Sequence, residues 1–214
     1  MSDDWNLFPC SIGEHSAFIL LDIGAYEVIE QAPSSLAKIW LTYKSPREDG
    51  LPTNEEFDQV KEIEDRIDGF SQSNDDWYVG RVTVDGQRVF YVYTSREESE
   101  WKHFLSEVSN ETHYDLDLSF LEDPSHEIYE KELYPNEDDW QVIKDLQVID
   151  ALNSYGDDGS EARKVDHWVY FDDKVSASEF IKWAESDRFT EDRRFSTRTE
   201  DGNIVFAYII VDRF

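Results

Sequence analysis

The sequence predicts an α+β protein made of two ferredoxin-like (split βαβ) units with antiparallel sheets, the second of them incomplete at its C-terminus. Three observations lead to this prediction: runs of β-branched and aromatic residues alternate with amphipathic helical segments, Asp-Gly pairs separate two pairs of such runs, and one order of elements occurs twice. The 214-residue chain is 39% hydrophobic and 14% aromatic, which is enough for packed cores.

In the N-terminal part we expect strands over 17–21 and 26–29, joined by a turn at Gly24-Ala25, and a third strand over 39–43. A helix follows, with Thr53 and Glu56 as its capping box and Gly69 as its end. Its apolar residues recur at helical spacing, at Phe57, Val60, Ile63 and Ile67.

An Asp-Gly hairpin is predicted next, with strands over 77–84 and 87–94 around residues 85 and 86. Ser95 and Glu98 form the capping box of a second helix, and residues 114–120 form a closing strand. From Ile39 onward the order is β-α-β-β-α-β, the split βαβ arrangement.

In the C-terminal part we expect a linking strand over 127–134 and a helix that starts at Pro135 and Asn136. This helix carries Trp140, Ile143, Leu146, Ile149 and Leu152 on one side and must end at Gly156, which can adopt a left-handed conformation. A strand over 165–171, a helix capped by Ser176 and Glu179, and a second hairpin around Asp201-Gly202 follow. The predicted domains are residues 1–122 and 123–214.

Residues 39–94 and 165–211 therefore share one pattern of strand, helix, strand, Asp-Gly and strand. The first copy continues into another helix and strand, whereas the second does not. A sheet without its last strand has an open edge, which invites pairing. The edge could be filled by residues 127–134, by a partner, by a second copy in a homodimer, or by a strand beyond the chain.

The charge of the chain is strongly one-sided, with 49 Asp and Glu against 20 Lys and Arg and a net charge of −29. Direct binding to nucleic acid is disfavoured because nucleic acid is itself a polyanion. The expected partner is a basic protein region, since opposite charge speeds the encounter. The alternative is that a salt-adapted host or the need for solubility explains the acidity.

Several classes of protein are excluded or disfavoured. The single Cys10 excludes an internal disulfide and a cysteine-rich zinc site. The N-terminus does not resemble a signal peptide, and no apolar run has the roughly 20 residues that span a bilayer, so we expect a cytoplasmic protein without membrane contact. The five histidines and the paired carboxylates lack metal-ligand spacing, and no nucleophile or phosphate-loop motif is present, so we predict no metal, no cofactor and no enzymatic activity.

Five residues around the start of the strand at 165–171 are the candidate interaction site. These are Asp157, Asp158, Arg163, Asp166 and His167. As a polar cluster they would meet a basic partner. The alternative interpretation is local, because an aspartate pair after a helix favours a turn and a strand histidine is commonly packed and hydrogen-bonded.

The C-terminal part resembles the family of the regulator of ribonuclease E activity B, whose members inhibit an RNA-processing endonuclease by binding it. The matching positions are Gly156, Asp157, Asp158, Arg163, Val165, Asp166, His167, Tyr170, Phe171, Phe180 and Phe189. The regulator usually continues through a further helix and strand to an aromatic end rich in Asp and Gly, and this chain departs from it there.

The N-terminal part is similar to domain of unknown function 695. The resemblance lies in the strand around Trp40, the segment from Tyr129 to Leu133, and the step from Leu133 through Tyr134 to Pro135. A fusion of these two families implies a protein that acts by contact.

The leading hypothesis is therefore a non-catalytic regulatory or adaptor protein that binds a basic protein region, which by resemblance is an RNA-processing nuclease. One alternative is a small-molecule binder or enzyme that uses a cleft between the domains and residues such as His167, Asp166 and Arg163. A second alternative is an acidic mimic of nucleic acid.

Overall fold

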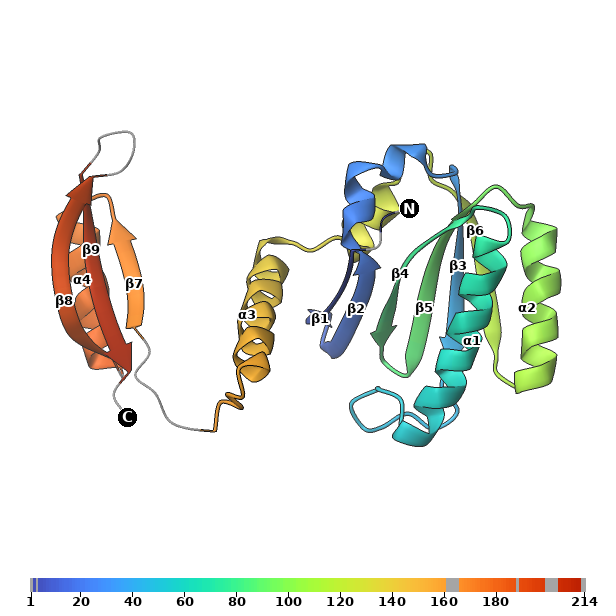
Figure 1. The fold of residues 1–214 in the computed structure, drawn as a ribbon, viewed down its shortest axis with the longest axis horizontal. Helices are drawn as coiled ribbons and strands as arrows, with labels where there is room; N and C mark the ends of the chain where they lie inside the picture. The colour runs from blue at the N-terminus through green and yellow to red at the C-terminus, as the bar shows by residue number, and fades with distance from the viewer. Residues whose placement is uncertain (1, 3, 161–165, 188, 199–203, 213–214) are drawn as a thin grey trace. The chain divides into compact units, whose positions relative to one another are not determined.

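Six strands form the sheet of the first of two units in the computed structural model, which describes residues 2, 4–160, 166–187, 189–198 and 204–212 (Figure 1). The first unit is Met1–Asp150 and the second is Ala151–Phe214. The first sheet has the order β1-β2-β4-β5-β3-β6, and every neighbouring pair is antiparallel. Its strands are β1 (Trp5–Ile12), β2 (His15–Asp22), β3 (Ser35–Thr42), β4 (Trp77–Val84), β5 (Gln87–Thr94) and β6 (Leu116–Glu122).

Two long helices, α1 (Asn54–Gln72) and α2 (Glu98–Thr112), cover one face of this sheet. Alternate residues of the strands face them, because successive side chains of a strand point to opposite sides. The resulting core includes Ile39 and Phe90 of the sheet, Ile63 of α1 and Trp101 of α2, all of them fully buried.

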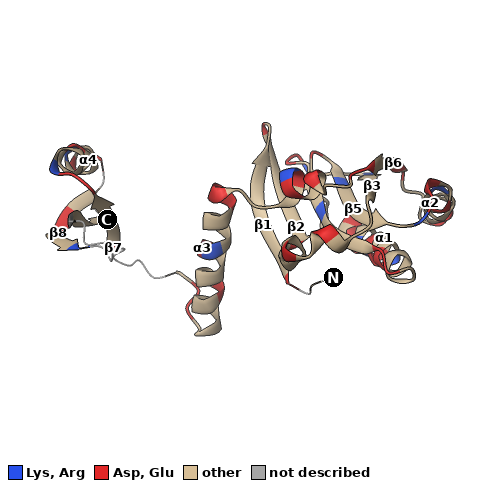
Figure 2. Cartoon of the chain, turned by 90° about the horizontal axis from the view of Figure 1, so that it is seen from above, with Lys and Arg blue, Asp and Glu red and all other residues tan. Residues whose placement is uncertain are grey.

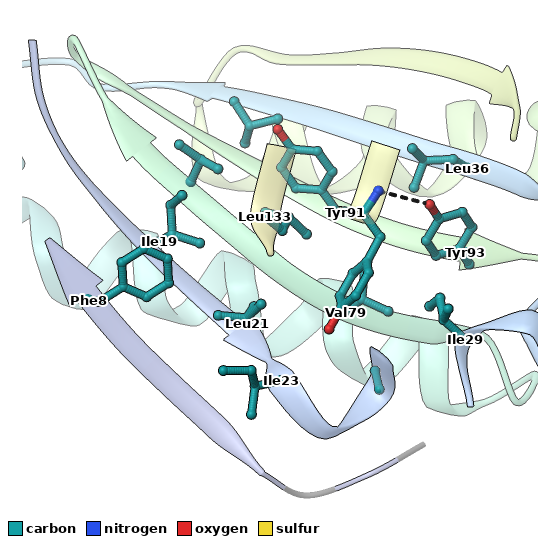
Figure 3. Close-up of a cluster of buried hydrophobic side chains, with 14 of the residues drawn as sticks. Phe8, Ile19, Leu21, Ile23, Ile29, Leu36, Val79, Tyr91, Tyr93 and Leu133 are labelled. Atoms are coloured by element: carbon teal, nitrogen blue, oxygen red, sulfur yellow. Dashed lines mark hydrogen bonds between the residues drawn. The ribbon is translucent and has the colours of Figure 1, made fainter. Parts of the chain in front are cut away.

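The opposite face of the same sheet is covered by shorter elements. These are the 3₁₀-helices η1 (Ile23–Glu27) and η2 (Ile29–Gln31), the π-helix η3 (Tyr129–Leu133) and the N-terminal half of α3 (Glu137–Ser154). Figure 3 shows this second core, where Leu133 of η3 lies over the sheet and the Tyr129 backbone N–H donates to the Tyr93 hydroxyl. The sheet of the first unit is thus buried on both faces.

The part of this sheet that starts at β3 has the strand order β6-β3-β5-β4, with α1 between β3 and β4 and α2 between β5 and β6. β3 and β4 both run antiparallel to β5, which lies between them. This confirms a mixed α and β unit with an antiparallel sheet. The connections are those of a split βαβ unit extended by β1 and β2, and the ferredoxin-like assignment itself stays a prediction.

The second unit contains β7 (Asp166–Phe171), α4 (Lys174–Ser186), β8 (Phe189–Arg198) and β9 (Ile204–Asp212). Its antiparallel sheet has the order β7-β9-β8. The series β7-α4-β8-β9 therefore repeats β3-α1-β4-β5 in both element order and strand order, as the shared sequence pattern predicts. Both hairpins are confirmed by pairing, although Asp201 and Gly202 lie outside the described residues.

Two predicted strands are wrong. Residues 26–29 run from η1 through a turn at Val28 into η2, and their burial does not alternate as it would on a strand with one buried face. Residues 127–134 contain η3, because the Asp123 carboxylate accepts from the N–H groups of Glu127 and Ile128 and starts a helical turn. This segment therefore does not fill an edge of the second sheet. The edge strand β1 was missed.

The helix ends differ from the predicted signals. Thr53 caps α1, but the Glu56 carboxylate accepts from the Lys44 and Ser45 N–H groups. The helix also continues past Gly69 to Gln72.

In α2 and α4 the N-terminal caps differ from the predicted ones, Ser95 with Glu98 and Ser176 with Glu179. The predicted end of α3 is confirmed. The capping box of α2 is Glu97 with Glu100, and the cap of α4 is Asp173. The predicted end at Gly156 is correct: its φ is +83°, and the Asp157 N–H donates to the Leu152 carbonyl.

The segment after β6 belongs by its contacts to the first unit. Tyr93 donates to Asp123 at 2.6 Å, and Lys38 pairs with Glu132 at 2.7 Å. The compact unit that contains this segment therefore extends to Asp150, and the second unit begins at Ala151. The sequence-based limits of 1–122 and 123–214 stay a prediction.

Candidate functional site: the second sheet

The aspartate pair of the candidate site lies in the loop after α3 and takes part in local turns. The Asp157 Oδ1 accepts from the Gly159 N–H, and the Asp158 Oδ1 accepts from the Ser160 N–H, each at 3.0 Å. Hydrogen bonds from Ser160 lower the pKa of Asp158, since they stabilise its ionised form. Both carboxylates therefore shape the loop that follows the helix.

Asp166 and His167 are consecutive on β7, so their side chains point to opposite faces of the sheet. Asp166 is exposed. The His167 ring lies on the α4 face, edge-on to Phe189 at 5.4 Å between ring centres. Arg163 lies outside the described residues. Of the four predicted residues that the structure describes, Asp157 and Asp158 thus belong to the loop after α3, and Asp166 and His167 lie on opposite faces of the second sheet.

The face opposite α4 carries large apolar side chains that the sequence-based prediction did not select. Trp168 and Tyr170 of β7 are each 53% exposed, and Phe195 of β8 is 36% exposed. Trp168 and Phe195 meet edge to face at 5.9 Å between ring centres. We name these three residues the aromatic face.

The strand register explains how the aromatic face is built. Tyr170 lies opposite Ala207 of the central strand β9, and Ala207 lies opposite Phe195 of β8. The small side chain of Ala207 leaves room for Trp168 and Phe195 to lean over the central strand. Val205, Ala207 and Ile209 of β9, which point to the same face as these rings, are buried.

The other face of the sheet is packed by α4. Ile181 and Ala184 of this helix are buried against Ile210 of β9, and Phe180 contacts Phe171 at 5.3 Å between ring centres. The two faces therefore differ: one is covered by a helix, and the other ends in partly exposed aromatic rings. Exposed aromatic clusters mark interaction sites more often than isolated apolar residues do.

The sequence contains a signal for the aromatic face, because Trp168 and Tyr170 lie two residues apart on the predicted strand and so share one face. In the structure the set Asp166, Trp168 and Tyr170 is the exposed one. Sequence reasoning could not tell which alternate set α4 would cover, because both sets contain aromatic residues.

Charge is unevenly divided between the two units. Acidic residues outnumber basic ones by 35 to 11 in residues 1–150 and by 14 to 9 in residues 151–214. Figure 2 shows Asp and Glu along α1 and α2 and at the start of α3. The strong negative field thus belongs mainly to the first unit.

Two further searches concern only the described part of the chain. No cluster of three or more His, Cys, Asp or Glu side chains there has the geometry to hold a metal ion. None of its helices combines the length and apolar character needed to cross a membrane.

Fold and surface together define a two-unit α and β protein in which the second unit presents an aromatic sheet face. The model of the family of unknown function DUF695 matches residues 3–134, more than half of the chain, and the chain belongs to this family. The model described as regulator of ribonuclease activity B matches residues 143–212, which include the whole second sheet. Searches of curated proteins and of solved structures give no significant match.

Proposed function

We propose that this protein regulates an RNA-processing endonuclease by binding it, and that the aromatic face is the contact surface. The observation that carries the proposal is the position of Trp168, Tyr170 and Phe195, which lie within the residues matched by the regulator model. Aromatic side chains are enriched among the residues that dominate binding energy at protein interfaces.

The proposed action is by contact, without chemistry on a substrate. Asp166 and His167 point away from each other, so they do not form an acid–base pair on one surface. The aromatic face offers apolar area and the Tyr170 hydroxyl, which suit a protein surface. RNA processing takes place in the cytoplasm of bacteria, and we assign the protein to that compartment.

The first unit contributes the field that attracts a basic partner region. Its excess of acidic residues disfavours direct binding to RNA and favours encounter with a positively charged protein segment. The division of labour is then steering by the first unit and docking by the second. Steering predicts an association rate that falls as salt is added.

The test measures binding of the full chain to the ribonuclease E-type endonuclease of the same host, together with inhibition of RNA cleavage. Trp168→Ala should weaken binding at least tenfold, equivalent to about 1.4 kcal/mol. The matched control is Trp183→Ala on α4, because Trp183 is 54% exposed but lies on the other side of the sheet. Equal effects of the two variants, or no effect of either, would contradict the proposal.

Two other outcomes identify rival roles. A homodimer that dissociates on Trp168→Ala, measured by sedimentation, would make the aromatic face a contact between copies of this chain. An acidic mimic of nucleic acid would instead compete with RNA for the nuclease and lose affinity on charge reversal in the first unit, with Trp168→Ala having no effect.

A further inference from the structure

The first unit contains a pocket of about 300 Å³ on the face of the sheet that carries α1. Strands β1 and β2 extend the sheet beyond β4, and the pocket lies where this extension meets the N-terminal end of α1. Its lining residues are Leu7, Phe18, Arg47, Leu51, Pro52, Asn54, Phe57, Arg81, Thr83 and Arg88. We name it the arginine pocket.

Three arginines line this pocket, in a chain where acids greatly outnumber bases. The lining contains no Asp or Glu among the residues that the structure describes. Arg47 is half exposed and pairs with Asp49 at 2.5 Å, outside the lining. Arg81 and Arg88 are the inner pair, with side chains 14% and 2% exposed.

A single carboxylate serves both inner arginines. Glu64 of α1 accepts from the Arg81 Nε at 2.7 Å and from the Arg88 Nη1 at 3.0 Å. It also accepts from the Tyr78 hydroxyl at 2.9 Å. Two guanidinium groups against one carboxylate leave an excess of one positive charge beside the pocket.

Several donors of the two guanidinium groups are not used within the described chain. Arg81 bonds through Nε, and Arg88 bonds through Nη1 to Glu64 and through Nε to the Thr83 hydroxyl at 3.3 Å. Both nitrogens Nη of Arg81 and the Nη2 of Arg88 have no such bond among the described residues. Guanidinium donors arranged in this way suit a planar or tetrahedral anion.

The rest of the lining is mostly apolar, with Asn54 and Thr83 as its polar residues. Leu7 and Phe57 are exposed, at 53% and 45%, and the Phe57 ring lies 6.0 Å from the Arg88 guanidinium carbon. Phe18 of β2 adds a second ring. A pocket with one cationic side and two aromatic rings fits a ligand that is anionic at one end and flat or apolar at the other.

We infer that the arginine pocket binds a small organic anion, with its carboxylate or phosphate group on Arg81 and Arg88 and its apolar part against Phe57 and Phe18. The ligand neutralises the excess positive charge that Glu64 leaves. This site is separate from the aromatic face of the second unit, so it stands or falls independently of the proposed function.

The experiment titrates the full chain with phenyl phosphate and with inorganic phosphate, followed by NMR signals of the arginine Nε–H groups and by calorimetry. The chemical-shift changes of Arg81 and Arg88 should reach saturation as phenyl phosphate is added. Phenyl phosphate should bind at least tenfold more tightly than inorganic phosphate. Arg81→Met should weaken phenyl phosphate binding at least tenfold, since the remaining Arg88 is then neutralised by Glu64. Phe57→Ala should remove most of the preference for phenyl phosphate over inorganic phosphate.

The matched control is Arg66→Met, because Arg66 of α1 is also ion-paired, with Glu111 at 2.8 Å, but does not line the pocket. It should leave both affinities unchanged. If Arg81→Met does not fold, the titrations are made with Arg47→Met and Phe57→Ala instead. Both side chains lie at the surface, so these variants should fold. Shifts that do not saturate, equal weakening by Arg66→Met, or an unchanged preference in Phe57→Ala would overturn the inference.

Discussion

The two units contain the same series of one strand, one helix and two strands, yet they bury it differently. In the first unit, β3 is paired on its outer side by β6, and the face opposite α1 is closed by η3 and the 3₁₀-helices. In the second unit, β7 is an edge strand of the described sheet, and the face opposite α4 ends in Trp168, Tyr170 and Phe195. A repeated topology therefore does not imply a repeated surface.

The two units also differ in charge. The first unit has both the buried sheet and most of the acidic excess, whereas the second has the exposed rings and a milder excess. Acidity acquired only through adaptation to salt would be expected in both units alike. The uneven distribution favours different roles for the two units.

The largest expected contrast is between Trp101 of the first unit and Trp168 of the second. Trp101 is fully buried and donates its indole N–H to the Thr94 hydroxyl, so Trp101→Ala should cost about 3–5 kcal/mol of unfolding free energy. Trp168→Ala should cost about 1 kcal/mol or less, because the ring is half exposed. Urea titrations followed by circular dichroism measure both, and equal losses would remove the distinction between core and surface.

The second contrast concerns carboxylates that pair with arginine. Glu64→Gln leaves two poorly exposed guanidinium groups without their carboxylate and should destabilise the first unit by about 3 kcal/mol. Glu191→Gln removes a pair in which Arg194 is 70% exposed, so its cost should be at most about 1 kcal/mol. Arg81→Met, which leaves Glu64 and Arg88 balanced, should cost less than Glu64→Gln in the same titration.

The third contrast uses two glycines. A Cβ at Gly80 of β4 would lie 2.5 Å from the Leu20 carbonyl oxygen of the neighbouring strand, so Gly80→Ala forces the strands apart. A Cβ at Gly156 would meet no atom of the described residues within 4 Å, so Gly156→Ala should cost only the left-handed backbone strain of about 1–2 kcal/mol. Thermal unfolding should rank Gly80→Ala as the more damaging change. The reverse order would mean that β2 and β4 can separate without loss.

The smallest expected effect is a pH dependence confined to the first unit. Burial, and then the hydrogen bond to Glu56, raise the pKa of Tyr114 to about 12. In the unfolded chain this hydroxyl ionises near pH 10. The folded state therefore holds the proton longer, and the stability contributed by neutral Tyr114 falls as the pH rises from about 10 to 12. Tyr114→Phe should reduce this loss in alkaline denaturation curves, and an identical pH slope in the variant would refute the assignment.

Several elements could be predicted from the sequence because short-range chemistry decides them. Asp85-Gly86 adopts the positive φ angles that a tight hairpin needs, and Gly156 ends α3 for the same backbone reason. Of the predicted stripe, Val60, Ile63 and Ile67 form the buried side of α1. Phe57 at the start of the stripe is instead 45% exposed. The repeat of strand and helix order was visible for this reason as well.

Tertiary packing decided the rest. Tyr129 and Leu133 are compatible with a strand or a helix, and their burial against the sheet, with the Tyr129 N–H donating to the Tyr93 hydroxyl, selected the helix. Asp166 and His167 were grouped by adjacency in sequence, but the pleat of β7 sends neighbouring side chains to opposite faces. Which aromatic set of β7 stays exposed depends on the face that α4 covers, and the arginine pocket depends on strands far apart in the chain, so neither can be derived from local sequence.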